Sequence, residues 1–170
     1  FTDDADLATS MRQIRNHGQD KRYHHPRIGI NGRLDSLQAA VLLAKLPIFP
    51  DEVAARGRIG ARYSELLADA NCVTPYLEPH NTSVYAQYTL RVDDRDAFIA
   101  RLGEQGIPTA VHYPVPLNLQ PVFADTGPPP GALPVAERAS SQVVSLPMHP
   151  YLSDGEQQQR TKCNGKKAPP

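Results

Sequence analysis

The chain has 170 residues, of which 40% are hydrophobic, and its 18 lysine and arginine residues balance 18 aspartate and glutamate residues. A chain of this size can bury one sizeable core, or a small domain together with part of another. A net charge of zero gives no overall field that would recruit nucleic acid or an anionic membrane, so any anion-binding site must be local.

The sequence lacks the patterns of a disulfide framework, a zinc ribbon and a membrane segment. Cys72 and Cys163 lie far apart, without Cys-x-x-Cys spacing. No apolar run is long enough to span a bilayer, and the first residues lack the order of a signal peptide. We therefore expect a cytoplasmic protein that binds neither nucleic acid nor membrane. The sequence begins at Phe1 without methionine, and we interpret it as part of a longer protein.

Residues 4–16 are predicted to form an amphipathic helix, because Leu7, Met11 and Ile14 recur at helical spacing. Gly18 is placed to end this helix. Residues 17–27 (HGQDKRYHHPR) then show no periodicity and carry many hydrogen-bond donors. They are predicted to form an exposed or site-lining loop.

The histidines of this loop raise the possibility of a metal site, because imidazole is a common ligand. The adjacent His24 and His25 would point in different directions in a strand and do not share a helix face. No cysteine or glutamate stands at ligand spacing from them. We therefore predict no metal site.

Residues 29–40 (GINGRLDSLQAA) are predicted to be a loop that runs directly into a helix. Gly29 and Gly32 can adopt backbone angles closed to other residues, so the loop can approach a ligand closely. Asn31 and Arg33 would then present amide and guanidinium donors. Donors beside a helix start suit a phosphate or a carboxylate, and a solvated surface loop is the alternative.

The helix after this loop has its own start signal. Asp35 and Gln38 fit a capping box, and Leu37, Val41 and Leu42 supply an apolar stripe at helical spacing. These residues predict an amphipathic helix that packs on a larger body.

A longer helix is predicted over residues 51–69, starting after Pro50. Gly57 and Gly60 lower the stability of its interior, which indicates close packing against a neighbour. Residues 71–79 are rich in turn formers and are the best candidate domain boundary.

The remainder predicts a compact α/β unit whose sheet is covered on one face. Residues 84–92 alternate as a half-buried strand does, Asp93 or Asp94 caps a helix that ends near Gly106, and residues 107–112 form another strand. Further along, residues 126–134 read as a loop, 135–142 as a short helix and 143–148 as a buried strand.

His112 and Tyr113 open the run HYPVPLNLQ directly after a predicted strand, where loops commonly bind ligands. At the other end of the chain, Ser153 and Glu156 fit a capping box. The residues that follow are polar and end on prolines, so we predict a disordered or aberrant tail over residues 155–170 without a functional role.

The pattern of residues 29–40, Gly-x-Asn-x-Arg-Leu-Asp-x-Leu-Gln-Ala-Ala, resembles the signature of the DegT/DnrJ/EryC1/StrS family of pyridoxal-phosphate-dependent sugar aminotransferases. The resemblance extends to the His-Tyr-Pro run at residue 112. It implies an α/β fold, the C-terminal part of a fold-type-I transferase. Residues 1–70 would be the helical end of the large cofactor-binding domain, and residues 71–154 a small α/β domain.

The resemblance also implies roles for single residues. The asparagine matching Asn31 reaches across a homodimer to the cofactor phosphate of the other subunit, and the arginine matching Arg33 lies near the same composite site. His112 and Tyr113 fall where the family approaches its nucleotide-sugar substrate. The family usually has histidine where this chain has Asn118.

Enzymes of this family transfer an amino group, usually from glutamate, to a keto sugar attached to a nucleotide. Residues 17–27 are most similar to enzymes that act on UDP-2-acetamido-2-deoxy-3-oxo-glucuronate in bacterial surface polysaccharide pathways. Arg33 as a partner for the substrate carboxylate would suit that substrate.

The resemblance places the Schiff-base lysine upstream of Phe1, so this chain contains no catalytic residue of its own. None of its lysines stands in a matching context; they are Lys21, Lys45, Lys162, Lys166 and Lys167. We therefore expect the chain alone to be inactive as a transaminase. The alternative is a non-catalytic binding or dimerisation module of the same family, with a metal-dependent hydrolase a distant third.

Overall fold

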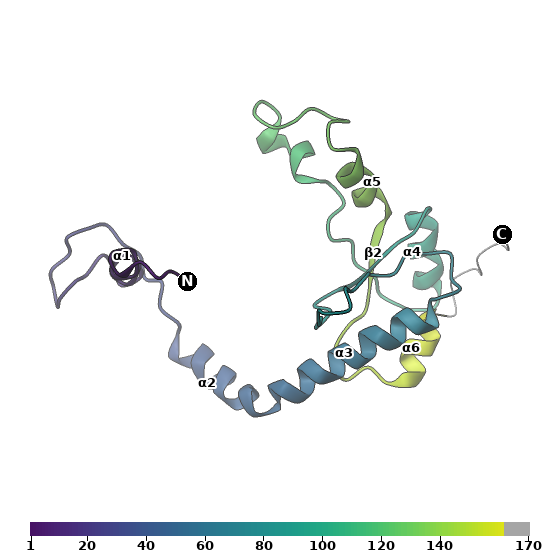
Figure 1. The fold of residues 1–170 in the computed structure, drawn as a ribbon, viewed down its shortest axis with the longest axis horizontal. Helices are drawn as coiled ribbons and strands as arrows, with labels where there is room; N and C mark the ends of the chain where they lie inside the picture. The colour runs from purple at the N-terminus through teal and green to yellow at the C-terminus, as the bar shows by residue number, and fades with distance from the viewer. Residues whose placement is uncertain (162–170) are drawn as a thin grey trace. The chain divides into compact units, whose positions relative to one another are not determined.

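The computed structural model describes residues 1–161, and the chain divides into two compact units. The first unit is Phe1–Ile48, and the second begins at Phe49. Figure 1 shows the elements of both units. The sequence analysis placed the domain boundary between residues 70 and 71, whereas the two compact units of the structure meet about one helix earlier.

The first unit contains two α-helices and a short 3₁₀ helix. Helix α1 (Ala5–Arg15) is capped by Asp4, whose carboxylate accepts hydrogen bonds from the backbone N–H groups of Asp6 and Leu7 at 2.9 and 3.0 Å. Helix α2 (Ser36–Lys45) starts at the predicted capping box, and η1 (Leu46–Ile48) follows it.

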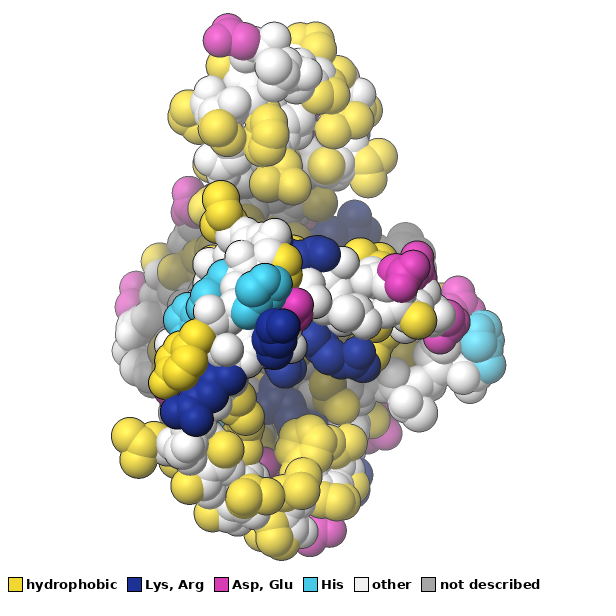
Figure 2. All heavy atoms as spheres, turned by 90° about the vertical axis from the view of Figure 1, so that its left-hand side faces the viewer, with side chains coloured by type: hydrophobic (Ala, Val, Ile, Leu, Met, Phe, Trp, Pro, Cys, Tyr) yellow, Lys and Arg dark blue, Asp and Glu magenta, His cyan; other side chains and the backbone are white. Residues whose placement is uncertain are grey.

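The first unit has no buried hydrophobic side chain among the described residues. The apolar stripe predicted on α2 is present but exposed; its exposed members are Leu37, Val41, Leu42 and Leu43. Figure 2 shows hydrophobic side chains, in yellow, among polar, basic and histidine side chains on the face in view. A contiguous exposed apolar surface of this kind marks a place where another protein surface packs.

The second unit contains helices α3 (Phe49–Leu66), α4 (Arg95–Glu104), α5 (Pro134–Gln142) and α6 (Asp154–Thr161). Two short 3₁₀ helices, η2 (Leu117–Leu119) and η3 (Pro121–Phe123), lie between α4 and α5. Asp94 caps α4 as predicted, accepting a hydrogen bond from the backbone N–H of Ala97 at 3.0 Å.

The sheet of the second unit is small and antiparallel. Strand β1 (Tyr88–Arg91) pairs with β2 (Val143–Leu146) in the register Tyr88 to Leu146. Single bridges add Val73 beside Arg91 and Ala110 beside Ser145. The sheet therefore has two strands, each with one further bridged residue on its outer edge.

Both predicted strands around α4 are shorter in the structure than in the sequence analysis. Residues 84–86 leave the sheet because their carbonyl groups bond to the guanidinium of Arg56. Residues 107–112 keep only the bridge at Ala110. The predicted alternation holds for Tyr88, Leu90 and Val92, which are buried, but Val84 and Ala86 are exposed. The backbone partners that define strand ends lie elsewhere in the chain, so the sequence pattern did not locate them.

One hydrophobic core holds the second unit together. It joins α3, α4 and both strands, and its largest buried apolar side chains are Tyr63, Leu67, Tyr88, Leu90, Leu102 and Val144. Because α3 contributes to this core, it belongs with the sheet rather than with the first unit.

Gly60 of α3 confirms the close packing that was predicted for the glycines of this helix. A Cβ atom on Gly60 would lie 2.2 Å from the ring of Tyr85, which leaves no room for any larger residue. At Gly57 the nearest atom to such a Cβ is 3.8 Å away, so only Gly60 is required by packing.

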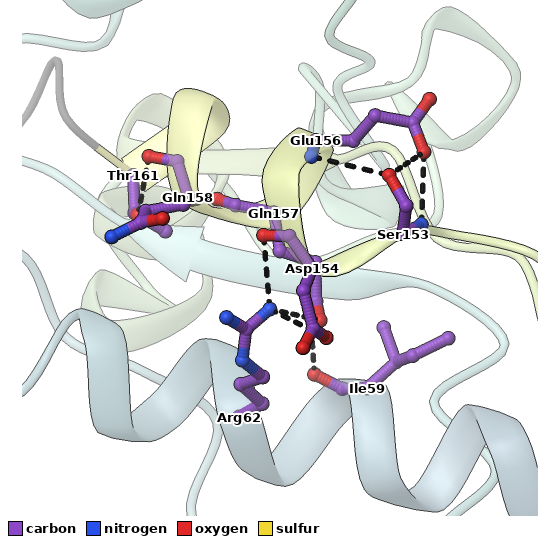
Figure 3. A network of polar contacts seen from close by, with 8 residues as sticks. All are labelled: Ile59, Arg62, Ser153, Asp154, Glu156, Gln157, Gln158 and Thr161. Atoms are coloured by element: carbon purple, nitrogen blue, oxygen red, sulfur yellow. Dashed lines mark hydrogen bonds and ion pairs between the residues drawn. The ribbon is translucent and has the colours of Figure 1, made fainter.

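Helix α6 is ordered where the sequence predicted a disordered tail. Gln157 has 1% of its surface exposed, and its Nε2 donates to the carbonyl of Ile59 at 2.9 Å, as Figure 3 shows. Arg62 donates to Gln157 Oε1 at 3.2 Å and pairs with Asp154 at 2.9 Å. A polar helix thus packs through hydrogen bonds to α3, and the predicted tail beyond Thr161 lies outside the described residues.

The capping box at the start of α6 formed as predicted. The backbone N–H of Ser153 donates to Glu156 Oε2 at 2.8 Å, and the backbone N–H of Glu156 donates back to Ser153 Oγ at 3.3 Å. These donors lower the pKa of the Glu156 carboxyl, first through the hydroxyl of Ser153. No helix within residues 1–161 is long and apolar enough to cross a membrane.

Candidate functional site

Asn31 and Arg33 lie together on the surface of the first unit, directly before α2. A backbone bridge pairs Asn31 with Asn16, and the N–H of Gly32 donates to the carbonyl of Arg15 at 2.8 Å. The end of α1 therefore holds the backbone of this loop, while the Asn31 and Arg33 side chains remain exposed.

The two side chains differ in how far they are fixed. Arg33 Nη1 donates to Asn16 Oδ1 at 2.9 Å, which leaves most of its donors available. Within residues 1–161, the side chain of Asn31 makes no hydrogen bond. Both therefore present unused donors on one exposed surface, which is an arrangement that suits an anion.

The glycines of this loop act differently from the prediction. Gly29 and Gly32 are absent from the residues with positive φ, so the loop does not use backbone angles reserved for glycine at these positions. A Cβ on Gly29 would instead lie 2.0 Å from the backbone nitrogen of Gly18. Gly29 and Gly18 are needed because two backbones meet at the neck of the loop.

The loop beyond this neck is polar and exposed. His24 Nδ1 lies 2.7 Å from Asp20 Oδ1, and this hydrogen bond is the main reason why the pKa of Asp20 is lowered. The Arg22 guanidinium lies 4.9 Å from the ring centre of Tyr23. In residues 1–161, no three His, Cys, Asp or Glu side chains are grouped as a metal ion would require.

His112 and Tyr113 lie in the second unit, two and three residues after the bridge at Ala110. The His112 ring is half-buried, and its Nδ1 lies 3.2 Å from Ser145 Oγ on β2. Tyr113 is 72% exposed, and the two rings meet edge to face with centres 5.8 Å apart. Tyr113 is therefore free to contact a ligand, while His112 is anchored to the sheet.

His112 lines two cavities. The larger, ≈ 510 Å³, is mainly apolar and runs along residues 112–117 to α5. The smaller, ≈ 260 Å³, lies beside Gln87, Thr109 and Ser145. Volumes of about 300–1,000 Å³ are usual for small-molecule sites, and a few polar groups on apolar walls fix a ligand's orientation.

Asn118, where the family usually has histidine, has a structural role. Its Nδ2 donates to Glu137 Oε1 at 3.0 Å, and the same carboxylate accepts from the backbone N–H groups of Gly131 and Leu133. The N–H of Gly131 is the first cause of the lowered pKa of Glu137. Asn118 thus helps to fold the proline-rich loop against α5.

The four predicted site residues form two pairs, one in each unit: Asn31 with Arg33, and His112 with Tyr113. The sequence analysis missed Asn16, which anchors Arg33, and Ser145, which anchors His112. Asn16 ends a predicted helix and Ser145 lies within a predicted strand, so neither stood out as a functional residue. Only the backbone pairing brings them to the site.

Similar proteins agree on one family. The chain is 55% identical over 152 residues to the UDP-2-acetamido-2-deoxy-3-oxo-D-glucuronate aminotransferase of Pseudomonas aeruginosa, covering 89% of this chain and 42% of that protein. It is 36% identical to the UDP-N-acetyl-3-dehydro-alpha-D-glucosamine 3-aminotransferase of Acidithiobacillus ferrooxidans, over 90% of this chain and 41% of that protein.

Solved structures agree as well. The crystal structure of a DegT DnrJ EryC1 StrS aminotransferase from Brucella abortus superposes with a TM-score of 0.88 at 44% identity, covering 96% of this chain and 44% of that one. The predicted α/β fold, as part of a fold-type-I transferase, is thereby confirmed. The chain spans less than half the length of these relatives.

The sequence model of the DegT/DnrJ/EryC1/StrS aminotransferase family matches residues 1–162. This match covers nearly the whole chain, and it confirms the resemblance first seen in residues 29–40 and in the run beginning at His112. The chain therefore belongs to the DegT/DnrJ/EryC1/StrS aminotransferase family.

Proposed function

We propose that this chain is part of a pyridoxal-phosphate-dependent aminotransferase that transfers an amino group, from glutamate, to a keto sugar attached to a nucleotide. The observation that carries the proposal is the 55% identity, over 89% of the chain, to an aminotransferase of that substrate class. The reaction would take place in the cytoplasm, as a step in the synthesis of a bacterial surface polysaccharide or amino sugar.

The first unit fits the phosphate group of the cofactor. The amide of Asn31 has two N–H donors without a partner within residues 1–161, and Arg33 adds guanidinium donors two residues away. When bound, pyridoxal phosphate supplies the electron sink for amino-group transfer. The part of Asn31 is to hold the phosphate and so to orient the cofactor.

The exposed position of Asn31 and Arg33 supports a site completed by a second subunit. Leu37, Val41 and Leu43 are 84%, 59% and 69% exposed on the helix that follows. An apolar surface next to unused hydrogen-bond donors that suit an anion fits a subunit interface. Such an interface would bring those donors to the cofactor of the second subunit. We propose a homodimer with a cross-subunit active site.

The second unit would hold the sugar nucleotide. Tyr113 is exposed beside His112, and both line an apolar cavity large enough for part of such a substrate. A phenol and an imidazole offer both flat apolar surface and hydrogen bonds, which suits sugar and base recognition. Arg33 would pair with the carboxylate of a uronic acid substrate.

The chain alone is proposed to lack transaminase activity. The lysines within the described residues are Lys21 and Lys45, and both are exposed on the surface of the first unit. Neither lysine lines a cavity beside His112, where the sugar nucleotide would bind. A measurable transamination rate for the isolated chain would contradict this.

The first test removes the proposed phosphate donor. In the aminotransferase that contains this segment, Asn31→Ala is expected to weaken cofactor retention by at least about tenfold, because a hydrogen bond to a charged group contributes about 1.5–3 kcal/mol and about 1.4 kcal/mol corresponds to a factor of ten. The dissociation constant is measured by cofactor absorbance after dialysis.

Asn81 provides the matched control, because it is an exposed asparagine in a loop of the other unit. Asn81→Ala should leave cofactor retention unchanged, and neither substitution should alter the melting temperature, since both side chains are exposed. Equal retention in the Asn31 and Asn81 variants would exclude the phosphate role and favour the non-catalytic binding module.

The second test concerns the substrate carboxylate. Arg33→Ala is expected to lower kcat/KM for a nucleotide-linked 3-oxo uronic acid about tenfold more than for the corresponding neutral sugar, because only the former loses a charged partner. Arg101→Ala, on an exposed position of α4, is the control. Equal losses for the two substrates would rule out carboxylate recognition by Arg33.

A further inference from the structure

We propose that Ser145, supported by Thr89, is a positioning residue that fixes the His112 ring as the neutral tautomer with its proton on Nε2. The consequence for the substrate rests on the proposed function: His112 would present an N–H donor to an oxygen of the nucleotide sugar. The positioning itself depends only on contacts within the second unit.

The backbone places the three side chains in line. Thr89 on β1 stands opposite Ser145 on β2. On the other edge of β2, Ser145 and Ala110 exchange backbone hydrogen bonds of 2.7 and 3.2 Å. His112 is two residues beyond Ala110, so it returns to the same face of the sheet as its partners. Two hydroxyl groups and one imidazole therefore meet on one face.

The contacts among the three side chains are hydrogen bonds. Thr89 Oγ1 lies 2.8 Å from Ser145 Oγ, and Ser145 Oγ lies 3.2 Å from His112 Nδ1. Ser145 is only 4% exposed, so its hydroxyl group depends on these two partners for hydrogen bonding. Within residues 1–161, no other side chain makes a hydrogen bond to Thr89 Oγ1, Ser145 Oγ or His112 Nδ1.

The direction of the hydrogen bonds follows from where the unused donor lies, because the three side chains carry three donor protons for two hydrogen bonds. If Thr89 donates to Ser145 and Ser145 donates to Nδ1, the unused donor is the Nε2 proton of His112. In the reverse order, Nδ1 donates to Ser145 and Ser145 to Thr89, and the unused donor is the Thr89 hydroxyl. His112 lines both cavities, where water or a ligand can accept its proton, whereas Thr89 lines neither. The first order is therefore favoured.

A neutral imidazole with a bare Nδ1 carries its proton on Nε2. His112 lines both cavities of the second unit, and Ser145 anchors its Nδ1 on the side of the smaller cavity. The ring then has one donor to offer and a restricted orientation, which is how a substrate oxygen can be distinguished from a substrate N–H group.

The test reads the protonated ring nitrogen directly, without substrate or cofactor. Nitrogen-15 NMR of the 170-residue chain, above the pH at which histidines are charged, distinguishes a bare from a protonated Nδ1. The His112 signals are identified by their loss in His112→Gln. A bare Nδ1 in the native chain is expected, and a protonated Nδ1 would overturn the proposal.

Two variants separate positioning from general packing. Ser145→Ala should move the His112 nitrogen signals toward an average of the two tautomers, whereas Ser141→Ala, at an exposed serine, should not. Thr89→Val keeps the shape of a strand residue and should leave Nδ1 bare, because Ser145 still has Nδ1 as its acceptor. A switch of tautomer in Thr89→Val would overturn the proposed direction.

A kinetic measurement then addresses the substrate role separately. In the aminotransferase that contains this segment, Ser145→Ala should raise KM for the nucleotide sugar about tenfold with little change in kcat, as expected for lost ground-state binding. A bare Nδ1 together with an unchanged KM would uphold the positioning by Ser145 and contradict the proposed role of His112 in substrate binding.

Discussion

Replacing Arg56 by alanine is expected to lower the free energy of unfolding of the second unit by about 3 kcal/mol, since hydrogen bonds to charged groups contribute about 1.5–3 kcal/mol each and do not add fully. The Arg56 guanidinium on α3 donates to the carbonyls of Val84, Tyr85 and Ala86 at 2.8, 2.7 and 3.0 Å, and to that of Met148 at 3.4 Å.

These bonds hold a strained and functionally placed loop. Tyr85 has φ of 41°, an angle that non-glycine residues rarely adopt, so its conformation depends on surrounding contacts. Ala86 and Met148 line the smaller cavity beside His112. Loss of Arg56 would therefore release one wall of that cavity as well as the loop.

Arg58 is the matched control, because it lies on the same helix but is exposed. Arg58→Ala should change the unfolding free energy by less than about 0.5 kcal/mol, the usual range for surface substitutions. Arg56→Lys should behave almost as the alanine variant, since a single ammonium group cannot reach carbonyls in several directions. Urea unfolding that gives equal stability for the Arg56 and Arg58 variants would contradict the role assigned to Arg56.

Local signals were sufficient for the helices. The caps Asp4 and Asp94, and the box of Ser153 with Glu156, act within one turn of the chain, so their meaning can be read from neighbouring residues. The predicted tail failed for the opposite reason. Helix α6 lacks an apolar face, and its anchor, Gln157, bonds to a residue 98 positions earlier. No pattern within the helix carries that information.

The residues of the candidate site also fall into those that local sequence identifies and those that only long-range contacts place. Asn31, Arg33, His112 and Tyr113 were selected from the motif, and the structure pairs them within each unit. Their supporting residues depend on long-range pairing of strands and loops, which sequence periodicity does not specify. The two glycines of residues 29–40 illustrate the difference. The motif requires them, but only the structure reveals that Gly29 is small because Gly18 lies against it.

The second large effect is a loss of stability at alkaline pH that depends on Tyr88. Its side chain is fully buried, and its hydroxyl group lies 2.8 Å from Ser64 Oγ. Burial, the largest cause, raises the pKa of Tyr88 to about 12, against an ordinary value of about 10 in the unfolded chain. The folded state thus keeps the phenol neutral where the unfolded state ionises it.

The raised pKa determines the direction in which stability changes with pH and the pH range over which it changes. Below pH about 10 both states are protonated and the full stability is present; between about 10 and about 12 stability falls as pH rises, by about 2.7 kcal/mol in total for a single group. Tyr88→Phe should therefore be less stable at neutral pH, by about 1 kcal/mol for the lost hydrogen bond, yet show a shallower decline between those pH values.

Urea unfolding of the native chain and the variant across this pH range gives the two slopes. Tyr63, whose pKa is also raised by burial, remains in the variant and leaves a residual decline. Tyr76→Phe, at a residue that is 80% exposed, should keep the native slope, because Tyr76 lies outside the buried core. If Tyr88→Phe and the native chain lost stability at the same rate, alkaline unfolding would have to arise from ionisation elsewhere in the core.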